Sequence, residues 1–415
     1  MRTLLLIAFI GIQFSMMAQQ HRNCGTMNYL DSRLANDATL AQKMKSQEAA
    51  LQKYIHSGIS EKSVITIPVI IHVLWASNQH NISDAQVYSQ IEVLNEDYRR
   101  MNMDTSDTPN DFDSLATDVE IEFCVAHQDP SGNWTNGITR TQVTKTSFDM
   151  SSDEAKYNSK GGVDAWDTRY YLNIWVVPSI TEGGQSGILG YAQFPGDDPA
   201  TDGVVIGYNY FGNMGSVSSP YDLGRTTTHE VGHWLDLYHI WGDDNGACWG
   251  TDHVDDTPNQ GNYHFGCPNH PAISCSNNGD MFMNYMDYTD DDCMNMFSLG
   301  QKERMVGIMN TTRLSLKNSG KCQANAIEMA PSKIEFSIMP NPAKDLVQLK
   351  WDNSNNTDNL VIQILDLSGH IVYTNTVANS TQNLEINTSE LSSGLYIIQI
   401  QNNALMGVQK LMIQH

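Results

Sequence analysis

The chain has 415 residues, and its 40% hydrophobic and 9% aromatic content is sufficient to bury at least one large core, so we expect two or more folded units. Its 24 basic residues against 47 acidic residues give a formal net charge of −23 at pH 7. This charge would repel nucleic acids and anionic membrane surfaces, and we therefore expect no nucleic-acid partner.

The N-terminus, MRTLLLIAFIGIQFSMMAQQ, places the basic Arg2 before a short apolar run that is followed by small or polar residues. This layout is typical of a secretory signal peptide, and cleavage after Ala18 would define it as residues 1–18. Met16 stands where a small residue is preferred, so an uncleaved N-terminal anchor is the alternative. No other stretch is apolar for long enough to span a bilayer. We expect a secreted protein, located outside the cell or on its outer surface.

Residues 19–61 are polar and helix-prone, and they end close to the turn-like sequence SGIS. This composition predicts a pro-segment or a capping helical arm ahead of the folded core.

The folded core is expected from residue 62 to residue 322. The apolar, β-branched run at 64–75 predicts a strand, and residues 83–102, which begin with a Ser or Asp cap and continue with helical apolar spacing, predict a helix. Further strands are predicted at 119–126, 170–177, 188–194 and 203–208. Strands and helices thus intermingle up to residue 210, and the rest of this region is mostly Gly- and Asp-rich loop.

The segment TTTHEVGHWLDLYH (226–239) places His229 and His233 four residues apart, on one face of a helix, where two imidazoles can bind one ion. Glu230, beside the first of them, can act as the general base that takes a proton from water and passes it to the leaving amine. His239 can be a third ligand only if the chain turns sharply before it. The pattern predicts a zinc site, and a surface helix with two incidental histidines is the alternative.

With NYMDY at 284–288, this segment resembles the metzincin metallopeptidases, whose motif is H-E-x-x-H-x-x-G-x-x-H followed by a distal methionine turn. The chain is most similar to the pappalysin family, which includes ulilysin, over about residues 62–322, where HVLW, DGVVI, DTP and CMNMFS also match. The resemblance implies an α+β catalytic domain with a twisted mixed sheet, an active-site helix and a loop-rich lower half. Asp236 stands where the motif has glycine, and because Asp enters the left-handed region at a cost of about 1 kcal/mol, we expect the turn to form.

The resemblance assigns further residues to the site. It implies that Met286 forms an apolar floor beneath the zinc and that Tyr288 helps to stabilise the tetrahedral intermediate, with plain core packing as the alternative for both. Asp292 would lie at the base of the pocket for the residue after the scissile bond and favour Arg or Lys there. Val204 and Ile206 would belong to an edge strand that pairs with the extended substrate.

The chain has seven cysteines, an odd number for an exported protein, so one is expected to be unpaired. Cys24 lies in RNCGT within the predicted pro-segment, and its thiolate can occupy the open zinc position until the segment is removed, which resembles a cysteine switch. A disulfide from Cys24 to the catalytic domain is the alternative. Family spacing implies the pairs Cys248–Cys275 and Cys267–Cys293, with Cys124 and Cys322 left as a third pair or as two buried thiols.

The loop GTDHVDDTPNQ contains Asp252, Asp255 and Thr257, which offer the hard oxygen ligands that calcium requires. The family resemblance also implies a calcium loop near the active site. A solvated acidic loop is the alternative.

Residues 333–415, which come after a predicted linker at 323–332, form short alternating runs separated by turn residues, a pattern typical of a small β-sandwich. The sequences MPNP, ILDLSGHIV and LSSGLYIIQI resemble the C-terminal sorting domains of type IX secretion cargo, which makes the type IX secretion machinery an expected partner. A substrate- or carbohydrate-binding module is the rival interpretation, but Trp351 is the one tryptophan in this segment.

The sequence therefore predicts a secreted, zinc-dependent and calcium-stabilised endopeptidase that is made as a zymogen and hydrolyses extracellular proteins or peptides. A non-catalytic cell-surface adhesin that keeps the zinc scaffold is the alternative, and Glu230 argues against it because such a protein has no need for a base beside the first ligand. A zinc hydrolase of non-peptide substrates is a third hypothesis.

Overall fold

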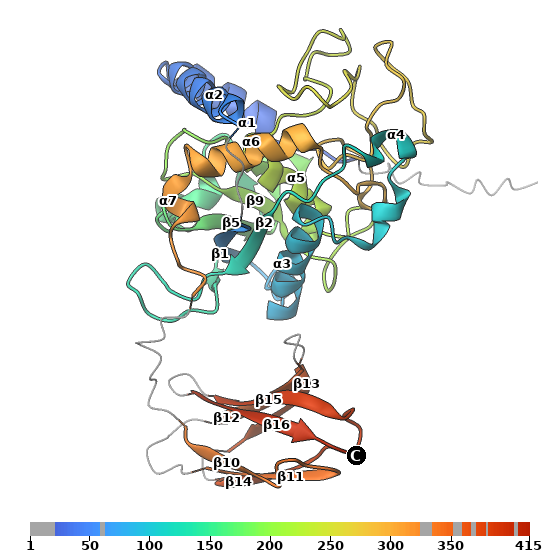
Figure 1. Cartoon of the computed structure of the whole chain (residues 1–415). Helices are drawn as coiled ribbons and strands as arrows, with labels where there is room; N and C mark the ends of the chain where they lie inside the picture. Colours follow the sequence, from blue (N-terminus) through green and yellow to red (C-terminus); the bar gives the residue numbers. More distant parts are fainter. Residues whose placement is uncertain are drawn as a thin grey trace, which may run out of the picture. The chain divides into compact units, whose positions relative to one another are not determined.

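The computed structural model describes residues 21–58, 63–323, 334–351, 359–366, 371–378, 381–401 and 406–415. The chain divides into two compact units, residues 1–324 and 325–415, and each is described by itself (Figure 1). The predicted signal peptide, the predicted end of the pro-segment at residue 61 and the predicted linker from residue 324 onward lie outside the described residues.

Residues 21–58, called the N-terminal arm below, contain two helices of the first unit. These are α1 (Thr26–Asn36) and α2 (Leu40–His56). Helix α2 packs on α6 (Leu299–Asn310), where its Leu51 is fully buried. A side chain at Gly307 of α6 would collide with Leu51, so glycine at this position lets the two helices lie close together.

A six-stranded sheet forms the centre of the first unit (Figure 1). Its order is β2 (Ile121–Val125), β1 (Ile65–Trp75), β5 (Leu172–Val177), β9 (Val204–Gly207) and β8 (Gly190–Ala192), and β3 (Ile138–Gln142) also pairs with β1. Strand β1 is parallel to β2, β3 and β5, and β5 is parallel to β9, whereas β8 is antiparallel to β9. The apolar run predicted at 64–75 is therefore a central strand, buried on both faces as parallel strands generally are.

The expectation that Val204 and Ile206 form a sheet edge is not met by the structure. Both residues are fully buried in β9, which has β5 on one side and β8 on the other. Ile174 of β5 pairs with Val204, and Gly190 of β8 pairs with Ile206, so the backbone of β9 is occupied within the sheet. The edge on this side is the short antiparallel strand β8, because it adds to the side of β9 that faces away from β5.

Two longer helices pack on this sheet and on each other. Helix α3 (Asp84–Tyr98) begins after Ser83, whose hydroxyl accepts a hydrogen bond from the Gln86 N–H, so the predicted cap and helix are both present. Helix α5 (Arg225–Trp234) contacts α3, β8 and β9. All of its residues are buried, which places the predicted zinc helix in the main apolar core.

The remaining elements of the first unit are short. A small sheet has the order β4 (Phe148–Asp149), β6 (Ile180–Glu182) and β7 (Gln185–Ile188). The short helices are η1 (Met103–Asp107), α4 (Asn110–Asp113), η2 (Glu154–Lys156), η3 (Asn158–Lys160), η4 (Tyr208–Tyr210), η5 (Asp291–Cys293) and α7 (Leu314–Lys317).

The part of the unit after α5 is loop-rich and is held by disulfides. Between residues 235 and 298, η5 is the one helical segment. The structure pairs Cys248 with Cys275 and Cys267 with Cys293, and it joins Cys124 of β2 to Cys322 at the end of the unit. Cys24 is the one free cysteine.

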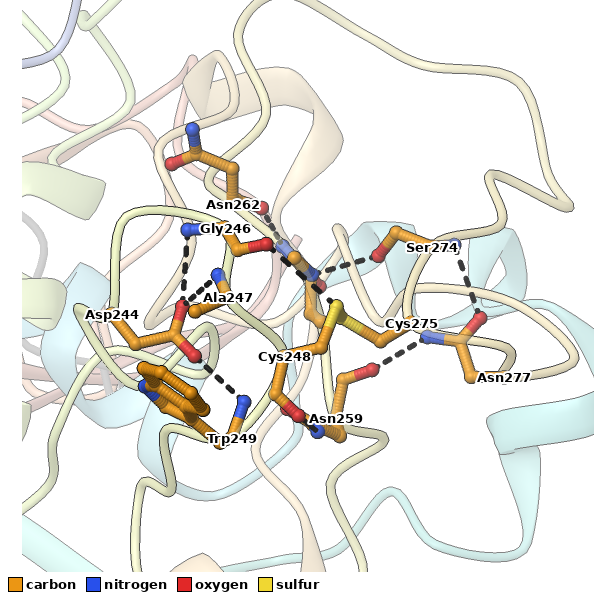
Figure 2. Close-up of a disulfide and its surroundings, with 12 residues drawn as sticks. Asp244, Gly246, Ala247, Cys248, Trp249, Asn259, Asn262, Ser274, Cys275 and Asn277 are labelled. Atoms are coloured by element: carbon orange, nitrogen blue, oxygen red, sulfur yellow. Dashed lines mark hydrogen bonds between the residues drawn. A yellow bond between two sulfur atoms is a disulfide. The ribbon is translucent and has the colours of Figure 1, made fainter.

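Hydrogen bonds around the Cys248–Cys275 disulfide show how a loop without regular structure is ordered (Figure 2). The Asp244 carboxylate accepts hydrogen bonds from the backbone N–H groups of Gly246, Ala247 and Trp249. On the other side of the disulfide, the Asn259 amide donates to the Cys248 carbonyl, and the Asn277 amide donates to the Asn259 carbonyl. Side chains thus satisfy backbone groups that a helix or sheet would otherwise pair.

The second unit is a small β-sandwich with its own apolar core. One antiparallel sheet has the order β10 (Phe336–Met339), β11 (Leu346–Trp351) and β14 (Asn383–Asn387). The other has the order β13 (Ile371–Val377), β12 (Leu360–Leu365), β15 (Gly394–Gln401) and β16 (Met406–Ile413). The predicted fold class, a mixed α/β domain with a β-sandwich after it, is confirmed. In the described ranges, none of the helices combines the length and the apolar character that crossing a membrane requires.

Candidate active site

Three histidines converge at the end of α5, although only two of them belong to the helix. His229 and His233 lie on one face of α5, and the Nε2 atom of His233 lies 3.1 Å from the Nε2 atom of His229. The Nε2 atom of His239, beyond the helix, lies 3.1 Å from that of His233. All three residues are buried.

Each imidazole is oriented through its other ring nitrogen. The Nδ1 of His229 lies 2.7 Å from the Tyr285 carbonyl oxygen, and the Nδ1 of His233 lies 2.7 Å from the Leu237 carbonyl oxygen. Because a carbonyl oxygen only accepts, both Nδ1 atoms donate, and the Nε2 lone pairs are left facing the centre of the cluster. Burial, followed by the neighbouring imidazoles, lowers the pKa of His229 and His233 well below the usual value, so these rings are neutral, as metal ligands are.

The third imidazole is held by a carboxylate. The Nδ1 of His239 lies 2.9 Å and 3.0 Å from the two carboxylate oxygens of Asp243. A carboxylate behind a metal-ligating histidine fixes the ring and increases its basicity. Sequence reasoning missed Asp243, because only the folded chain shows where the His239 ring points.

The donor set fits a single tetrahedral ion. The Sγ atom of Cys24 and one nitrogen from each histidine all lie within 4.8 Å of one another. Zinc binds imidazole nitrogens at about 2.0–2.1 Å in a tetrahedron, which places neighbouring nitrogens about 3.3 Å apart and agrees with the spacing of these Nε2 atoms. Imidazole nitrogen and thiolate sulfur are both donors that zinc binds, and three histidines with a fourth, exchangeable position are typical of catalytic zinc.

Asp236 makes the turn that brings His239 back to the cluster. It has φ of 77°, in the left-handed region, as the sequence predicted for this departure from glycine. Its side chain accepts a hydrogen bond of 2.5 Å from Nη2 of the buried Arg304, whose Nε donates to the Asp236 carbonyl oxygen at 3.2 Å. Arg304 thus binds both the backbone and the side chain of the turn, which offsets part of the cost of the left-handed conformation.

Met286 packs against the backbone of α5 at Gly232. A Cβ atom at Gly232 would lie 2.5 Å from the Met286 sulfur, so glycine at this position lets the methionine approach the helix backbone. Met286 thus packs on the helix that carries two of the histidines, and its role as an apolar floor beneath the zinc stays a prediction.

Glu230 faces two side chains of the N-terminal arm. Its Oε2 atom accepts a hydrogen bond of 2.7 Å from the Thr26 hydroxyl and one of 3.3 Å from the Cys24 thiol. Burial raises the pKa of Glu230 to about 7, against the opposing effect of these hydrogen bonds. Burial and the Glu230 charge also raise the pKa of the Cys24 thiol, whereas a cation at the histidine cluster would favour its thiolate. The contact of Thr26 was not foreseen from the sequence.

The edge strand β8 lies directly against the catalytic helix. A Cβ atom at Gly190 would lie 2.9 Å from Glu230 Cγ, so the absence of a side chain allows this close approach. The N-terminal arm pairs with this edge, because Cys24 bridges Gly190 in parallel and the Gly25 N–H donates to the Gly190 carbonyl at 2.9 Å.

A buried arginine of the arm identifies a second pocket beside the cluster. The Arg22 side chain is 1% exposed, and its Nη2 atom donates to Asp291 Oδ1 at 2.5 Å. Its Nε atom donates to the Thr289 carbonyl at 3.2 Å, and its guanidinium lies 4.9 Å from the centre of the Tyr221 ring. The pocket is therefore built for a guanidinium, through a carboxylate, a carbonyl and an aromatic face.

Asp292, predicted to form the base of such a pocket, lies beside it. Asp292 is exposed, and its Oδ1 atom lies 3.2 Å from the sulfur of Cys267 and 3.5 Å from that of Cys293. Asp291, one residue earlier, is fully buried and binds Arg22.

Tyr288 lies at the wall of the histidine cluster. Its ring centre is 5.0 Å from that of His239 and 5.7 Å from that of His229, and burial raises the pKa of its hydroxyl well above the usual value. Trp241 packs 4.7 Å from the Tyr288 ring and stacks on His239 at 4.2 Å. The tyrosine can therefore reach a group that binds in place of Cys24.

Of the three residues predicted to bind calcium, Asp252 and Thr257 are in contact, whereas Asp255 is not part of this contact. Asp252 is buried, and its Oδ2 atom accepts a hydrogen bond of 2.7 Å from the Thr257 hydroxyl. Burial raises the pKa of Asp252 to about 7. Asp255 is exposed and lines a cavity of about 290 Å³ together with Asp256 and Glu303.

Two regions of the chain match models of known protein families. The profile of the peptidase family M43, described as pregnancy-associated plasma protein-A, matches residues 155–310. The profile of a secretion system C-terminal sorting domain matches residues 337–414. The chain is also 33% identical over 282 residues to an extracellular metalloprotease of Arthroderma benhamiae, which covers 66% of this chain and 82% of that protein.

Two solved structures share the fold of the first unit. Mature mirolysin of Tannerella forsythia in complex with a cleaved peptide is 54% identical, covers 64% of this chain and 98% of that one, and has a TM-score of 0.59. A promirolysin variant of the same organism, in which a glutamate is replaced by alanine, is 48% identical, covers 73% of this chain and 98% of that one, and has a TM-score of 0.65.

The role of Asp243 is testable through metal affinity. We expect Asp243→Asn to weaken zinc binding by about 10- to 100-fold, because an amide loses the charge that supports His239. Competition with a chromophoric chelator measures this directly. Asp244→Asn is the matched control, since Asp244 binds loop N–H groups instead of an imidazole. Equal zinc affinity of Asp243→Asn and wild type would contradict the assignment.

Proposed function

Because the chain belongs to the pappalysin family of secreted metallopeptidases, we propose that it is a zinc endopeptidase, made as a zymogen, that cleaves extracellular proteins before arginine or lysine. The observation that carries this proposal is the convergence of three buried imidazole nitrogens beside the Glu230 carboxylate. His229, His233 and His239 are the residues that would hold the zinc ion.

When bound, zinc supplies Lewis acidity that polarises a peptide carbonyl and acidifies a water molecule. Glu230 takes the proton of the attacking water, holds it on its carboxylate and delivers it to the leaving nitrogen. Tyr288 donates a hydrogen bond to the oxygen that becomes negative in the tetrahedral intermediate. Its position beside His239 supports this role.

The substrate backbone lies along the edge strand β8. The N–H and C=O groups on the outer side of β8 are those that the arm now uses, including the Gly190 carbonyl and the Ala192 N–H. An extended peptide that replaces the arm gains these hydrogen bonds, as peptides do when they add to a sheet edge.

Preference for a basic residue is supported by the Arg22 pocket. Arg22 shows that a guanidinium fits against Asp291, and this pocket takes the side chain of the residue after the scissile bond. We assign the carboxylate to Asp291 in place of Asp292, because Asp292 faces the sulfurs of Cys267 and Cys293.

Latency comes from the N-terminal arm. Cys24 occupies the fourth position of the donor set, while Thr26 and the Cys24 thiol bind the Glu230 carboxylate. The arm therefore blocks the metal and the general base together, and activation requires removal of residues up to about 61. Lys62, the nearest basic residue at that boundary, lies outside the described residues.

Two further assignments belong to the proposal. A calcium ion would be held by Asp252 and Thr257, since a buried carboxylate is stabilised by a cation, whereas the exposure of Asp255 weakens its inclusion. The C-terminal sandwich would deliver the protein to the type IX secretion machinery, which the match to a sorting domain supports.

Glu230 provides the central test of the mechanism. In trimmed protein, Glu230→Gln should lower kcat on a peptide with arginine after the scissile bond by about 10²- to 10⁴-fold, because the general base is lost. Zinc content should stay at one per chain, since the three imidazoles are unchanged. Normal turnover by the variant, or wild-type activity that survives removal of the metal by a chelator, would refute the proposal.

Latency is testable in the untrimmed precursor. Cys24→Ala precursor should trim itself faster than wild-type precursor, because the thiol no longer occupies the metal position and the arm is held by its remaining contacts alone. Asn23→Ala is the matched control, since the Asn23 side chain is exposed. The switch is excluded if Cys24→Ala precursor matures no faster than the Asn23→Ala control while the trimmed form of the variant is active.

The two adjacent carboxylates can be separated by paired variants. Asp291→Asn should reduce the ratio of kcat/KM for arginine over glutamine after the scissile bond by about 10- to 100-fold, because a charge-assisted hydrogen bond is lost. Asp292→Asn should leave this ratio unchanged. The opposite pattern would return the assignment to Asp292.

A further inference from the structure

Two side chains of α1 fasten the N-terminal arm to the first unit at a place remote from the histidines. The Tyr29 hydroxyl donates to Asp153 Oδ1 at 2.5 Å, and its ring lies 5.0 Å from the Tyr191 ring. Arg33 binds Asp197 through two parallel hydrogen bonds, from Nε at 2.7 Å and from Nη2 at 2.9 Å, and its Nη1 donates to Asp153 Oδ2 at 3.3 Å. Asp153, Tyr191 and Asp197 belong to the part of the first unit after the arm, so they remain in the protein when the arm is removed.

Asp153 and Asp197 form a pocket, called the distal pocket below, whose charges balance only while the arm is present. The side chains of Asp153 and Asp197 are 9% and 6% exposed, and the fully buried Lys156 places its Nζ atom 3.9 Å from Asp153. With Arg33 in place, two carboxylates face two cations. When the arm leaves, Lys156 faces both carboxylates and one negative charge is uncompensated. Because two neighbouring carboxylates repel each other when one of their cations is lost, the emptied pocket favours a new cation.

The distal pocket lies on the opposite side of the catalytic cluster from Asp291. From Cys24 onward the arm runs along the segment 190–197 in the same direction: Thr26 accepts from the Ala192 N–H at 2.8 Å, Tyr29 reaches Gln193, and Arg33 reaches Asp197. Arg22, which precedes Cys24, reaches Asp291. The arm therefore spans the cleft from one carboxylate pocket to the other, with Cys24 at the metal between them.

The positions of the two pockets along the arm, with the metal position between them, set the register of a substrate. If the Asp291 pocket takes the residue after the scissile bond, the residues before that bond lie over 190–197. From Thr26 to Arg33 the helix advances about 10 Å, which about three residues of an extended chain cover. The substrate then runs in the opposite direction to the arm, antiparallel to β8.

We propose that Asp197 and Asp153 form a distal substrate subsite that binds an arginine side chain about three to five residues before the scissile bond. The inference rests on the proposed function and extends it, because it makes the enzyme selective for substrates with basic residues on both sides of the cleaved bond. Arginine fits best, since Asp197 receives Arg33 through both carboxylate oxygens.

The test uses trimmed enzyme and a set of peptides that share arginine after the scissile bond. One position at a time, from two to six residues before the bond, carries arginine, glutamine or glutamate. We expect kcat/KM to be about tenfold higher with arginine than with glutamine at one of the positions three to five residues before the bond. Asp197→Asn should remove this difference, so that the arginine and glutamine peptides are cleaved with equal kcat/KM, and Asp197→Lys should reverse the preference toward glutamate.

Asp167→Asn is the matched control, because Asp167 also binds an arginine, Arg169, through both carboxylate oxygens but lies before β5. It should keep the arginine preference. Equal kcat/KM for arginine and glutamine at every position, or a preference that survives Asp197→Asn, would overturn the inference and leave the distal pocket as an anchor for the arm alone. Failure of the proposed function is distinguishable, since then none of the peptides would be cleaved.

Discussion

The left-handed turn at Asp236 is the constraint on which the site depends. A helix continued beyond His233 would carry the third imidazole about 9 Å along its axis, away from the other two. The turn ends α5, directs the Leu237 carbonyl onto His233 Nδ1 and returns His239 to within 3.1 Å of His233. A non-glycine residue at φ of 77° is strained, and here the same side chain that incurs the strain binds Arg304. Aspartate in place of the glycine of the motif thus adds backbone strain at the turn, and its side chain gains a buried ion pair with Arg304.

A single segment blocks every part of the cleft that a substrate needs. Within five residues, Arg22 fills the Asp291 pocket, Cys24 faces the metal position and Thr26 binds Glu230. Farther along the arm, Glu48 binds Arg304, the residue that supports the turn, at 2.9 Å. In the proposed zymogen, removal of one continuous segment frees the pocket, the metal position and the base at once. No disulfide has to be broken, because Cys24, the one cysteine of the arm, is unpaired.

Local spacing predicted the site better than it predicted the surroundings. The i, i+4 histidines and the turn at Asp236 are properties of a few consecutive residues, and both could be predicted. Which strand lies at the edge of the sheet could not be predicted. Both 188–194 and 203–208 have the composition of strands, and their order in the sheet depends on long-range pairing. Asp291 and Asp292 are indistinguishable in sequence, and the short helix η5 decides which carboxylate faces inward. Asp243 was missed because its role requires knowing where His239 points.

X-ray absorption at the zinc K-edge of the precursor and of the trimmed protein tests the metal site most directly. The account predicts three nitrogen neighbours at about 2.0–2.1 Å in both forms, with one sulfur neighbour at about 2.3 Å in the precursor that is replaced by oxygen after trimming. A precursor spectrum without sulfur, or with fewer than three imidazole neighbours, would contradict the conclusion that His229, His233 and the returning His239 hold one ion whose fourth position the arm closes.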